Sequence, residues 1–485
     1  MANLKDILFG VKLKAISGDR DREISGLTFD SRKVRPGDLF VAIKGLNSDG
    51  HDHLEEAVAQ GAVALLIEKS KVKFSDNITV IETDNCAKEL GIIADNFYDH
   101  PSKKLKLIGI TGTNGKTTSV TLLYSLFSRL GYQVGLLSTV ENIIGKTTIP
   151  SHFTTPDVIT INELLVKMLA KGCQYVFMEV SSHALVQERT SGLSFAGGIF
   201  TNLSHDHMDY HQSFDEYIKA KKILFDHLKE NAFALINADD KRGKIMIQNT
   251  KSRIFNYGMR GSGDFTAKLL NNTFQGLELG INDQNIWFQL IGSFNAYNIL
   301  TAYAVAMILG EDSQETLIQL SQCRGARGRF EYVSNDYNIL AIVDYAHTPD
   351  ALNNVLLTID NLRTKNEQLI TVLGCGGNRD REKRPKMASI ATSYSDKVIL
   401  TSDNPRFESP EKILDDMMNG VSPVYHKRVM RVTDRREAIR VACNLANKTD
   451  VILVAGKGHE DYQEIQGKRV HFDDKKILTQ MLSKS

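Results

Sequence analysis

Residues 104–118 read KLKLIGITGTNGKTT, an apolar run that leads into a turn containing two glycines. The apolar run predicts a buried strand, and residues 119–130 carry a helical periodicity that ends at Gly131. Glycines let backbone N–H groups close on phosphate oxygens, and the N-terminus of the following helix contributes a positive dipole. This order of strand, turn and helix therefore predicts a phosphate-binding loop.

The loop also carries side chains suited to ATP. Lys116 can reach the β- and γ-phosphates, and the Thr117 hydroxyl suits Mg²⁺. The general pattern GxxxxGK[ST] would place glycine at position 110, which is Ile110 here, so the alternative is a tight turn with a solvent-facing lysine. Because the flanking strand and helix fit, we predict an ATP site. Its loop residues are Gly112, Thr113, Asn114, Gly115, Lys116, Thr117 and Thr118.

The alternation of strand and helix continues along most of the chain. This spacing predicts parallel strands with right-handed crossovers, and the length of 485 residues suggests about three domains. We expect an α/β fold in which ligands bind past the carboxyl ends of the strands. Strands are predicted at 134–138, 175–180, 339–343, 369–373, 397–401 and 451–455, with a helix at 161–171 and an Arg/Gly-rich linker at 324–329.

The composition excludes several classes of protein. The 59 Lys and Arg residues balance 58 Asp and Glu residues, which gives no overall drive towards nucleic acid or an anionic membrane. The five cysteines never form a CxxC pair, which argues for a reducing compartment and against a disulfide framework or a thiolate zinc site. No run approaches the roughly 20 apolar residues of a membrane helix, and charges interrupt the N-terminus too early for a signal peptide. We expect a soluble, cytoplasmic protein.

A second polar cluster lies downstream of the loop. Glu179 follows a predicted strand, where a Mg²⁺ ligand could face the phosphate loop. Residues 205–211 hold three His and two Asp; zinc is conceivable there, but Mg²⁺ beside ATP fits better because no Cys is present. Lys221 shares a helix face with Tyr217, one turn earlier. The residues alone describe Lys221 as a solvated lysine, with Lys222 an equal candidate for any role.

Taken together, the motifs resemble those of the Mur ligases, ATP-dependent enzymes that add amino acids to the peptide of the peptidoglycan precursor. Within that family the chain is most similar to ligases that add the third residue to UDP-N-acetylmuramoyl-L-alanyl-D-glutamate. The motifs are TGTNGKTT (111–118), MEVSSHALVQER (178–189), NLSHDHMDYH (202–211) with Ala220 and Lys221, GSFNAYN (292–298), GRF (328–330), VDYAHTPDAL (343–352), GCGGNRDREKRP (374–385), DNPR (403–406) and AGKGHEDYQ (455–463).

The resemblance implies three domains with separate tasks. Residues 1–102 would bind the UDP-muramoyl substrate, and residues 103–326 would bind ATP on a P-loop ATPase-type parallel sheet. Residues 327–485 would form a Rossmann-like domain that binds the incoming amino acid and closes over the site. The positions that the resemblance assigns to the UDP-muramoyl substrate are Ser31, Thr154, Thr155, Ser181, Gln187 and Arg189.

The resemblance also implies roles around ATP. Thr117 and Glu179 would serve a first Mg²⁺, and Lys221, carbamylated, would hold a second with His207; Ala220-Lys221 matches the family motif better than Lys222. Asn295 and Asn298, three residues apart on one face of a predicted helix, would lie at the adenine. Arg329 and Asp344 would lie at the hinge and face ATP. The general base stays open, with His347 and His183 as candidates.

Three predicted strand ends carry polar loops suited to an amino acid. Arg379 and Arg406 can bind carboxylates, and Asp403 or Glu460 can accept ammonium groups. Family members with DNPR resemble meso-diaminopimelate adders, because the Arg reads the extra carboxylate, and lysine adders usually lack it. We therefore predict meso-diaminopimelate as the substrate. The pocket residues are Arg379, Asp403, Asn404, Pro405, Arg406, Gly456 and Glu460.

The predicted reaction joins an amine to a carboxylate. ATP would phosphorylate the D-glutamate γ-carboxylate, and the amine would then displace phosphate, with Mg²⁺ and Lys116 neutralising charge. The predicted partners are small molecules only, without nucleic acid or membrane, and a monomer is expected. The alternatives are the same ligation with L-lysine and, from another class, a nucleotide-controlled binding module. Folylpolyglutamate synthase shares the ATPase core, but DNPR and the block around Ser31 speak against it.

Overall fold

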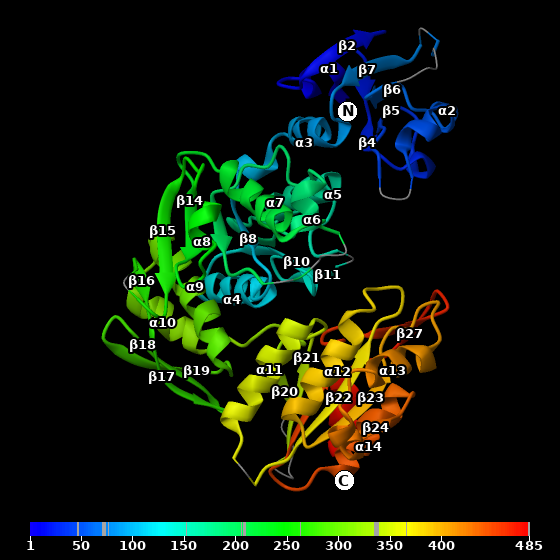
Figure 1. Ribbon diagram of the computed structural model, residues 1–485. Helices are drawn as coiled ribbons and strands as arrows, with labels where there is room; N and C mark the ends of the chain where they lie inside the picture. Colours follow the sequence, from blue (N-terminus) through cyan, green and yellow to red (C-terminus); the bar gives the residue numbers. More distant parts are fainter. Residues whose placement is uncertain are drawn as a thin grey trace.

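The structure is a computed structural model, and Figure 1 shows it as three successive lobes along the chain. Each lobe is built on its own large sheet. The residues that the structure describes are 1–45, 48–69, 74–75, 77–151, 153–204, 206, 210–261, 263–333, 339–364 and 366–483.

The first lobe holds a five-stranded sheet of order β2-β7-β6-β5-β4, parallel except for β2. In β4 to β7, alternating or continuous apolar residues are buried against helices on both faces, whereas the edge strand β2 is mostly exposed. The elements are β1 (Ala2–Asn3), α1 (Leu4–Ile7), β2 (Leu13–Ser17), β3 (Glu23–Ile24), β4 (Gly26–Thr28), β5 (Asp38–Val41), α2 (Leu54–Ala59), β6 (Ala64–Ile67), β7 (Thr79–Thr83) and α3 (Cys86–Phe97).

The central lobe holds a nine-stranded sheet of order β11-β10-β9-β12-β8-β13-β14-β15-β16. Strands β8, β9 and β12 to β16 are parallel, and β10 and β11 form an antiparallel hairpin at one edge. The strands are β8 (Lys106–Thr111), β9 (Val134–Leu137), β10 (Glu141–Ile144), β11 (Thr147–Pro150), β12 (Tyr175–Glu179), β13 (Gly197–Phe200), β14 (Phe233–Asn237), β15 (Arg253–Gly258) and β16 (Phe265–Thr266).

Helices cover both faces of this sheet and divide its apolar core into two layers. One layer packs under α4, α9 and α10, and the other under α5, α6 and α7. A small antiparallel sheet adjoins the first layer; its strands are β17 (Lys268–Thr273), β18 (Gly276–Ile281) and β19 (Gln284–Phe288). The helices are α4 (Lys116–Arg129), α5 (Val158–Ala170), α6 (Ser182–Val186), α7 (Phe214–Asp226), α8 (Gly243–Met246), α9 (Ser293–Leu309) and α10 (Ser313–Ser321).

The last lobe holds a six-stranded sheet of order β20-β21-β25-β22-β23-β24, with only β20 antiparallel. Helices α11 to α13 cover one face, and α14 and α15 cover the other. The elements are β20 (Glu331–Val333), β21 (Leu340–Asp344), α11 (Pro349–Leu362), β22 (Leu369–Cys375), α12 (Lys383–Tyr394), β23 (Lys397–Ser402), α13 (Pro410–Met418), β24 (Val429–Arg431), α14 (Arg435–Leu445), β25 (Val451–Ala455), β26 (Tyr462–Ile465), β27 (Lys468–His471) and α15 (Asp474–Leu482).

The predicted α/β class is confirmed, and each predicted strand lies within two residues of an observed one. The helix after the phosphate loop begins at Lys116, three residues before the predicted start, because Gly115 caps it in a left-handed conformation. The sequence did not predict the hairpin β10–β11 or the sheet β17-β18-β19. Among the described residues no helix is long and apolar enough to cross a membrane.

Candidate functional site

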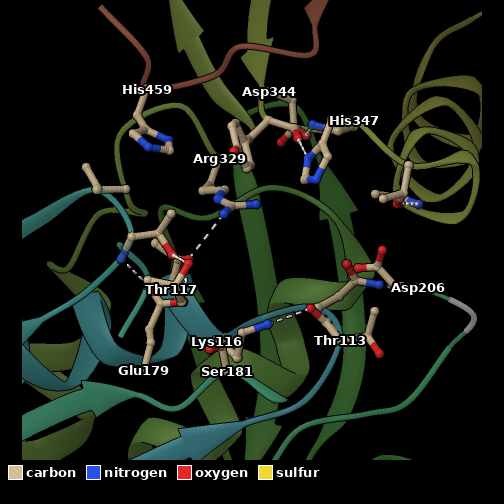
Figure 2. Close-up of a pocket in the computed structure, with 18 of the residues that line it drawn as sticks. Thr113, Lys116, Thr117, Glu179, Ser181, Asp206, Arg329, Asp344, His347 and His459 are labelled. Atoms are coloured by element: carbon tan, nitrogen blue, oxygen red, sulfur yellow. Dashed lines mark hydrogen bonds between the residues drawn. The ribbon is translucent and has the colours of Figure 1, made fainter. Parts of the chain in front are cut away.

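A cavity of about 1590 Å³ lies where the carboxyl ends of the central and last sheets face each other. It is lined by the loop after β8, by the end of β12, and by the loops that follow β21, β22, β23 and β25. Figure 2 shows its centre, where the phosphate loop lies opposite Arg329, Asp344 and His347. This is the position at which ligands bind in open α/β sheets.

The phosphate loop is shaped by two glycines. Gly112 has φ +149°, and a Cβ there would lie 1.9 Å from the Thr201 hydroxyl oxygen. Gly115 has φ +86° and precedes the first residue of α4. The Lys116 Nζ donates to the carbonyls of Gly112 and Thr113, both at 2.8 Å, so its ammonium lies within the loop. Burial lowers the pKa of Lys116, and Glu179 partly opposes that effect.

A hydroxyl and a carboxylate converge beside this loop. Glu179 ends β12 and is fully buried. The Thr117 hydroxyl donates to Glu179 Oε2 at 3.0 Å, and the Thr139 amide donates to Oε1 at 2.7 Å. Arg329 reaches across from the linker before the last sheet and donates to Thr117 Oγ1 at 3.2 Å. Hard oxygens at a phosphate loop are the ligands that Mg²⁺ prefers, so this pair fits the first predicted metal.

Lys221 is buried, not solvated as its sequence alone suggests. Its Nζ donates to the Gly112 carbonyl at 2.9 Å and lies 4.5 Å from the centre of the Tyr217 ring, on the predicted shared face. Burial lowers the pKa of Lys221 well below its ordinary value, and the nearby Lys116 lowers it further against an opposing effect of Asp206. Such an environment favours the neutral amine, the form that can take up carbon dioxide.

The rest of the predicted metal cluster is only partly described. Lys222 pairs with Asp226, one turn along α7. This ion pair distinguishes Lys222 from Lys221, for which it was an equal candidate. His207 lies outside the described residues, as do His205 and Asp209. Within the described ranges, no group of three or more His, Cys, Asp and Glu could hold a metal ion by itself. Thr117 and Glu179 would supply one hydroxyl and one carboxylate to a metal at this position.

The predicted adenine residues form a hydrogen-bonded chain inside the protein. Asn295 and Asn298 are both buried on α9. Asn298 Nδ2 donates to Asn295 Oδ1 at 2.8 Å, and Asn295 Nδ2 donates to the Ile291 carbonyl at 2.7 Å. The Ser119 hydroxyl donates to Asn298 Oδ1 at 3.2 Å, which ties α9 to α4. Asn298 lines the cavity, and Asn295 supports it from behind.

Five of the six residues predicted for the UDP-muramoyl substrate line the same cavity; they are Thr154, Thr155, Ser181, Gln187 and Arg189. Arg189 donates through Nη1 to the Thr155 carbonyl at 2.8 Å and through Nη2 to Gln187 Oε1 at 2.6 Å. The Ser181 amide donates to Thr155 Oγ1 at 3.0 Å, and Thr154 accepts a bond at its hydroxyl from its neighbour Thr139. These contacts fix Arg189 with its charge at the cavity wall.

Among the predicted site residues that the structure describes, five do not line the cavity. Gly112, Asn295 and Lys221 lie directly behind its wall, in contact with residues of the loop or with Asn298. Pro405 is turned away, with its carbonyl accepting the amide of Glu408. Ser31 belongs to the first lobe, in a short 3-10 helix from Ser31 to Lys33.

Asp344 anchors the start of the last lobe. It ends β21, and its carboxylate accepts the backbone amides of Phe330 at 2.6 Å and Ala346 at 2.7 Å. Burial raises the pKa of Asp344 despite the opposing charge of Arg329. The Arg329 guanidinium stacks over the Tyr345 ring at 4.6 Å from its centre. Asp344 and Arg329 therefore form a rigid corner where the linker meets the cavity.

Histidines line the same wall. The His347 Nδ1 lies 2.8 Å from the Tyr345 carbonyl, which requires the proton on Nδ1 and leaves Nε2 as the acceptor in the neutral ring. Burial, together with Lys383, lowers the pKa of His347 to about 4, so the ring is neutral near pH 7. His183, the other predicted candidate, lines the cavity on the central lobe and packs against Tyr210.

The pocket predicted for an amino acid is built from the predicted strand ends. The carboxyl ends of β22, β23 and β25 bring together Arg379, Asp403, Asn404, Arg406, Gly456 and Glu460, all of which line the cavity. Arg406 has φ +53° and donates through Nη1 to the Gly377 carbonyl at 2.8 Å, while its Nε lies 3.5 Å from Glu464. Its guanidinium is thus held at the pocket wall.

The pKa values of two carboxylates in this pocket are shifted in opposite directions. Burial raises the pKa of Asp403, but Lys457, Arg435, a backbone hydrogen bond and Arg406 together hold it below its ordinary value. Burial and the neighbouring charge of Asp403 raise the pKa of Glu460. An ammonium group entering the pocket would stabilise both carboxylates in their charged forms.

Sequence reasoning assigned no role to several cavity residues. Asp350, at the start of α11, accepts the Asn114 amide at 3.2 Å and the Ser204 hydroxyl at 2.8 Å, so it joins the last lobe to the phosphate loop. Burial and nearby cations lower the pKa of His459 to about 3. Both residues belong to quoted motifs, VDYAHTPDAL and AGKGHEDYQ, and that membership was the available signal.

Three family models match the chain. The model described as Mur ligase family, catalytic domain matches residues 23–98, the Mur ligase middle domain matches 110–306, and the Mur ligase, glutamate ligase domain matches 328–458. Each of the three matched segments falls within one lobe of the structure.

The chain is also similar to named relatives over its full length. It is 54% identical to the UDP-N-acetylmuramoyl-L-alanyl-D-glutamate–2,6-diaminopimelate ligase of Cytophaga hutchinsonii, over 99% of each chain. The ligase of the same name from Bacteroides fragilis is 49% identical, again over 99% of each. A solved structure of a ligase of that name is 32% identical, with a TM-score of 0.68, over 99% of this chain and 98% of the other. The MurF ligase of Thermotoga maritima in complex with ADP shares the fold, at 20% identity and a TM-score of 0.62 over 90% of this chain and 94% of the other.

Proposed function

Because the chain belongs to the Mur ligase family, we propose that it is an ATP-dependent ligase that adds meso-diaminopimelate to UDP-N-acetylmuramoyl-L-alanyl-D-glutamate. The observation that carries the proposal is that one cavity joins a phosphate loop to a pocket with both cationic and anionic side chains. A nucleotide and an amino acid could thus bind on either side of the UDP-muramoyl substrate in one cavity. The names of relatives at about half identity support the same activity.

In the first step, the γ-carboxylate of D-glutamate would attack the γ-phosphorus of ATP, and ADP would leave with the broken P–O bond's electron pair. The product is an acyl phosphate. Lys116, at the phosphate loop, would offset the charge on the transferring group. Arg329, which spans from the linker to Thr117, would face the same phosphates. Arg189, held by Gln187, would orient the UDP-muramoyl substrate.

In the second step, the amine of diaminopimelate would attack the acyl carbon, and phosphate would leave from the tetrahedral intermediate. Arg406 and Arg379 would bind carboxylates of the amino acid, and Asp403 and Glu460 would bind its ammonium group. His347, neutral and with Nε2 as its acceptor, would take the proton that the amine loses. No protein nucleophile is needed in either step.

We further propose that Thr117 and Glu179 hold Mg²⁺, which fits the hydroxyl and carboxylate oxygens that converge there. When bound, the metal would neutralise phosphate charge. Lys221 fits a metal only as its carbamate, because an ammonium group repels a cation; its depressed pKa supports that modification. His207 stays a predicted ligand of the second metal.

Some wider properties are also proposals. We propose that residues 1–102, 103–326 and 327–485 act as UDP-muramoyl-binding, ATP-binding and amino-acid-binding domains. A cytoplasmic setting is supported by the five cysteines, all of which are free and buried. That the protein is a monomer stays a prediction.

The test measures ADP release with the UDP-muramoyl dipeptide, Mg²⁺ and either meso-diaminopimelate or L-lysine. We expect turnover with diaminopimelate, and Arg406→Ala should lower its kcat/KM at least about tenfold, because a charge-assisted bond to a carboxylate is lost. The control is Arg431→Ala on β24, whose side chain pairs with Glu411 and Asp415 outside the cavity. This variant should keep native turnover.

Two other outcomes separate the alternatives. Turnover with L-lysine, unchanged in Arg406→Ala, would keep the ligase but contradict the assignment of diaminopimelate. ADP release that is indifferent to both amines would contradict ligation and favour a nucleotide-controlled binding module.

A further inference from the structure

Lys457 is a buried charge for which the proposed reaction has no use. It belongs to the loop after β25, and its side chain is fully buried. It does not line the cavity, although its neighbours Gly456, Glu460 and Tyr462 do. Burying an ammonium group is costly unless other groups pair with it, so the contacts of Lys457 show what the fold uses it for.

These contacts all lead to the amino-acid pocket. The Lys457 Nζ donates to Asn404 Oδ1 at 3.1 Å and to Glu460 Oε2 at 3.1 Å. Asn404 Nδ2 in turn donates to Glu460 Oε2 at 2.8 Å, which closes a three-membered network. The ammonium also lies 5.3 Å from the centre of the Tyr462 ring. Lys457 therefore links the loop after β23, the loop after β25 and the strand β26.

The network fixes the orientation of two pocket side chains. Asn404 Oδ1 accepts from both Lys457 and the Glu464 amide, so its Nδ2 must point towards Glu460. Within the described part of the chain, the side-chain hydrogen bonds of Glu460 fall on Oε2. Its Oε1 accepts neither of these two bonds and so keeps its capacity to accept from an ammonium group. Apart from burial itself, Lys457 has the largest effect on the pKa of Asp403, and it lowers that pKa.

We propose that Lys457 is the positioning residue of the amino-acid pocket: from behind the wall it holds Asn404 and Glu460 in the arrangement that receives an ammonium group of the incoming amino acid. It also supplies the positive charge that lets two carboxylates, Asp403 and Glu460, share one buried pocket. This inference rests on the proposed function, and it names the residue on which selection of the amino acid depends.

The test compares Lys457→Met with the native protein in three Michaelis constants. The KM for diaminopimelate should rise about tenfold or more, because a hydrogen bond between charged groups is removed. The KM values for ATP and for the UDP-muramoyl dipeptide should stay within about twofold of native values, because the other two sites are untouched. A merely structural role would instead change all three or leave all three unchanged, and either result would overturn the inference.

A double-mutant cycle tests whether Lys457 acts through Glu460. Glu460→Gln alone should raise the KM for diaminopimelate, and the double variant should be no worse than Glu460→Gln by more than about twofold. If the two single-variant increases in KM instead multiply in the double variant, the inference is overturned. The matched control is Lys475→Met on α15, which removes a lysine paired with Glu331 at 2.6 Å outside the pocket and should leave every KM unchanged.

Two further provisions keep the outcome unambiguous. If Lys457→Met fails to fold, Lys457→Gln is measured against the same criteria, since an amide keeps a donor but no charge. A native protein that ignores diaminopimelate would refute the proposed function. A native protein that uses diaminopimelate, with an unchanged KM in the Lys457 variant, would refute this inference alone.

Discussion

At the scale of single residues, the cavity wall holds groups whose ionisation the fold controls. His347 is one such group, because burial lowers its pKa from 6.5 to about 4. The unfolded chain therefore binds a proton below pH 6.5 that the folded chain rejects until the pH approaches 4. The contribution of His347 to the free energy of unfolding is therefore fully present above pH 6.5. It is lost as the pH falls from 6.5 to about 4.

This sign gives a prediction for stability. Between pH 8 and pH 5, His347 should account for a loss of about 1–2 kcal/mol in the free energy of unfolding, a range that allows for its partial exposure to the cavity. His347→Asn should lose less stability over the same interval. Melting temperatures of both proteins at the two pH values check this. His227→Asn, at the exposed end of α7, should behave like the native protein; an identical pH dependence in all three proteins would contradict the prediction.

Which residues the sequence could identify depended on how local their signal was. Lys116 and Thr117 were predictable because one strand, one turn and one helix position them within a few residues. Lys221 was not, since its burial arises from a contact with Gly112, 109 positions earlier. Lys457 belongs to the motif AGKGHEDYQ, but its burial and its role did not show, because its partner Asn404 is 53 residues away and on another strand end. Long-range packing, which no short pattern encodes, decides such cases.

At the scale of elements, long periodic segments were predictable and short edge strands were not. Buried strands such as β25 carry continuous apolar runs that local pattern identifies. The hairpin β10–β11 pairs over only four residues of each strand, and its outer strand is mostly exposed, so its sequence has no distinctive alternation. Its place at the sheet edge is set by β9, to which β10 pairs.

The turn between β8 and α4 is the element on which the proposed phosphate binding would depend. Gly112→Ala should lower kcat/KM for ATP at least about tenfold, because a Cβ would lie 1.9 Å from the Thr201 hydroxyl and the loop would have to shift. Gly131→Ala is the matched control, since Gly131 also has a positive φ but meets no atom within 4 Å. It should cost about 1 kcal/mol of stability through backbone strain and leave the KM for ATP unchanged. ADP release and thermal melting distinguish the two variants, and equal effects would contradict a specific role for the loop.

At the scale of the whole molecule, hydrogen bonds join the central and last lobes on either side of the cavity. Asp350 accepts hydrogen bonds from Asn114 and Ser204, and Arg329 donates to Thr117. These contacts link the last sheet to the phosphate loop around the site where an acyl phosphate would form. Since water would hydrolyse that intermediate, the fit between the lobes should decide how much ATP is turned over without amide formation.

Asp350→Ala should therefore uncouple the reaction more than it slows it. Removing the carboxylate breaks two contacts between the lobes, and water should then reach the acyl phosphate before the amine does. The measurement is the ratio of ADP released to amide product formed with diaminopimelate present, which should be one in the native protein and should exceed one in the variant. Asp360→Ala, near the exposed end of the same helix and paired with Arg363, is the control and should keep a ratio of one. A ratio of one in Asp350→Ala, with turnover merely reduced, would show that Asp350 serves the chemistry or the binding of substrate and not the exclusion of water.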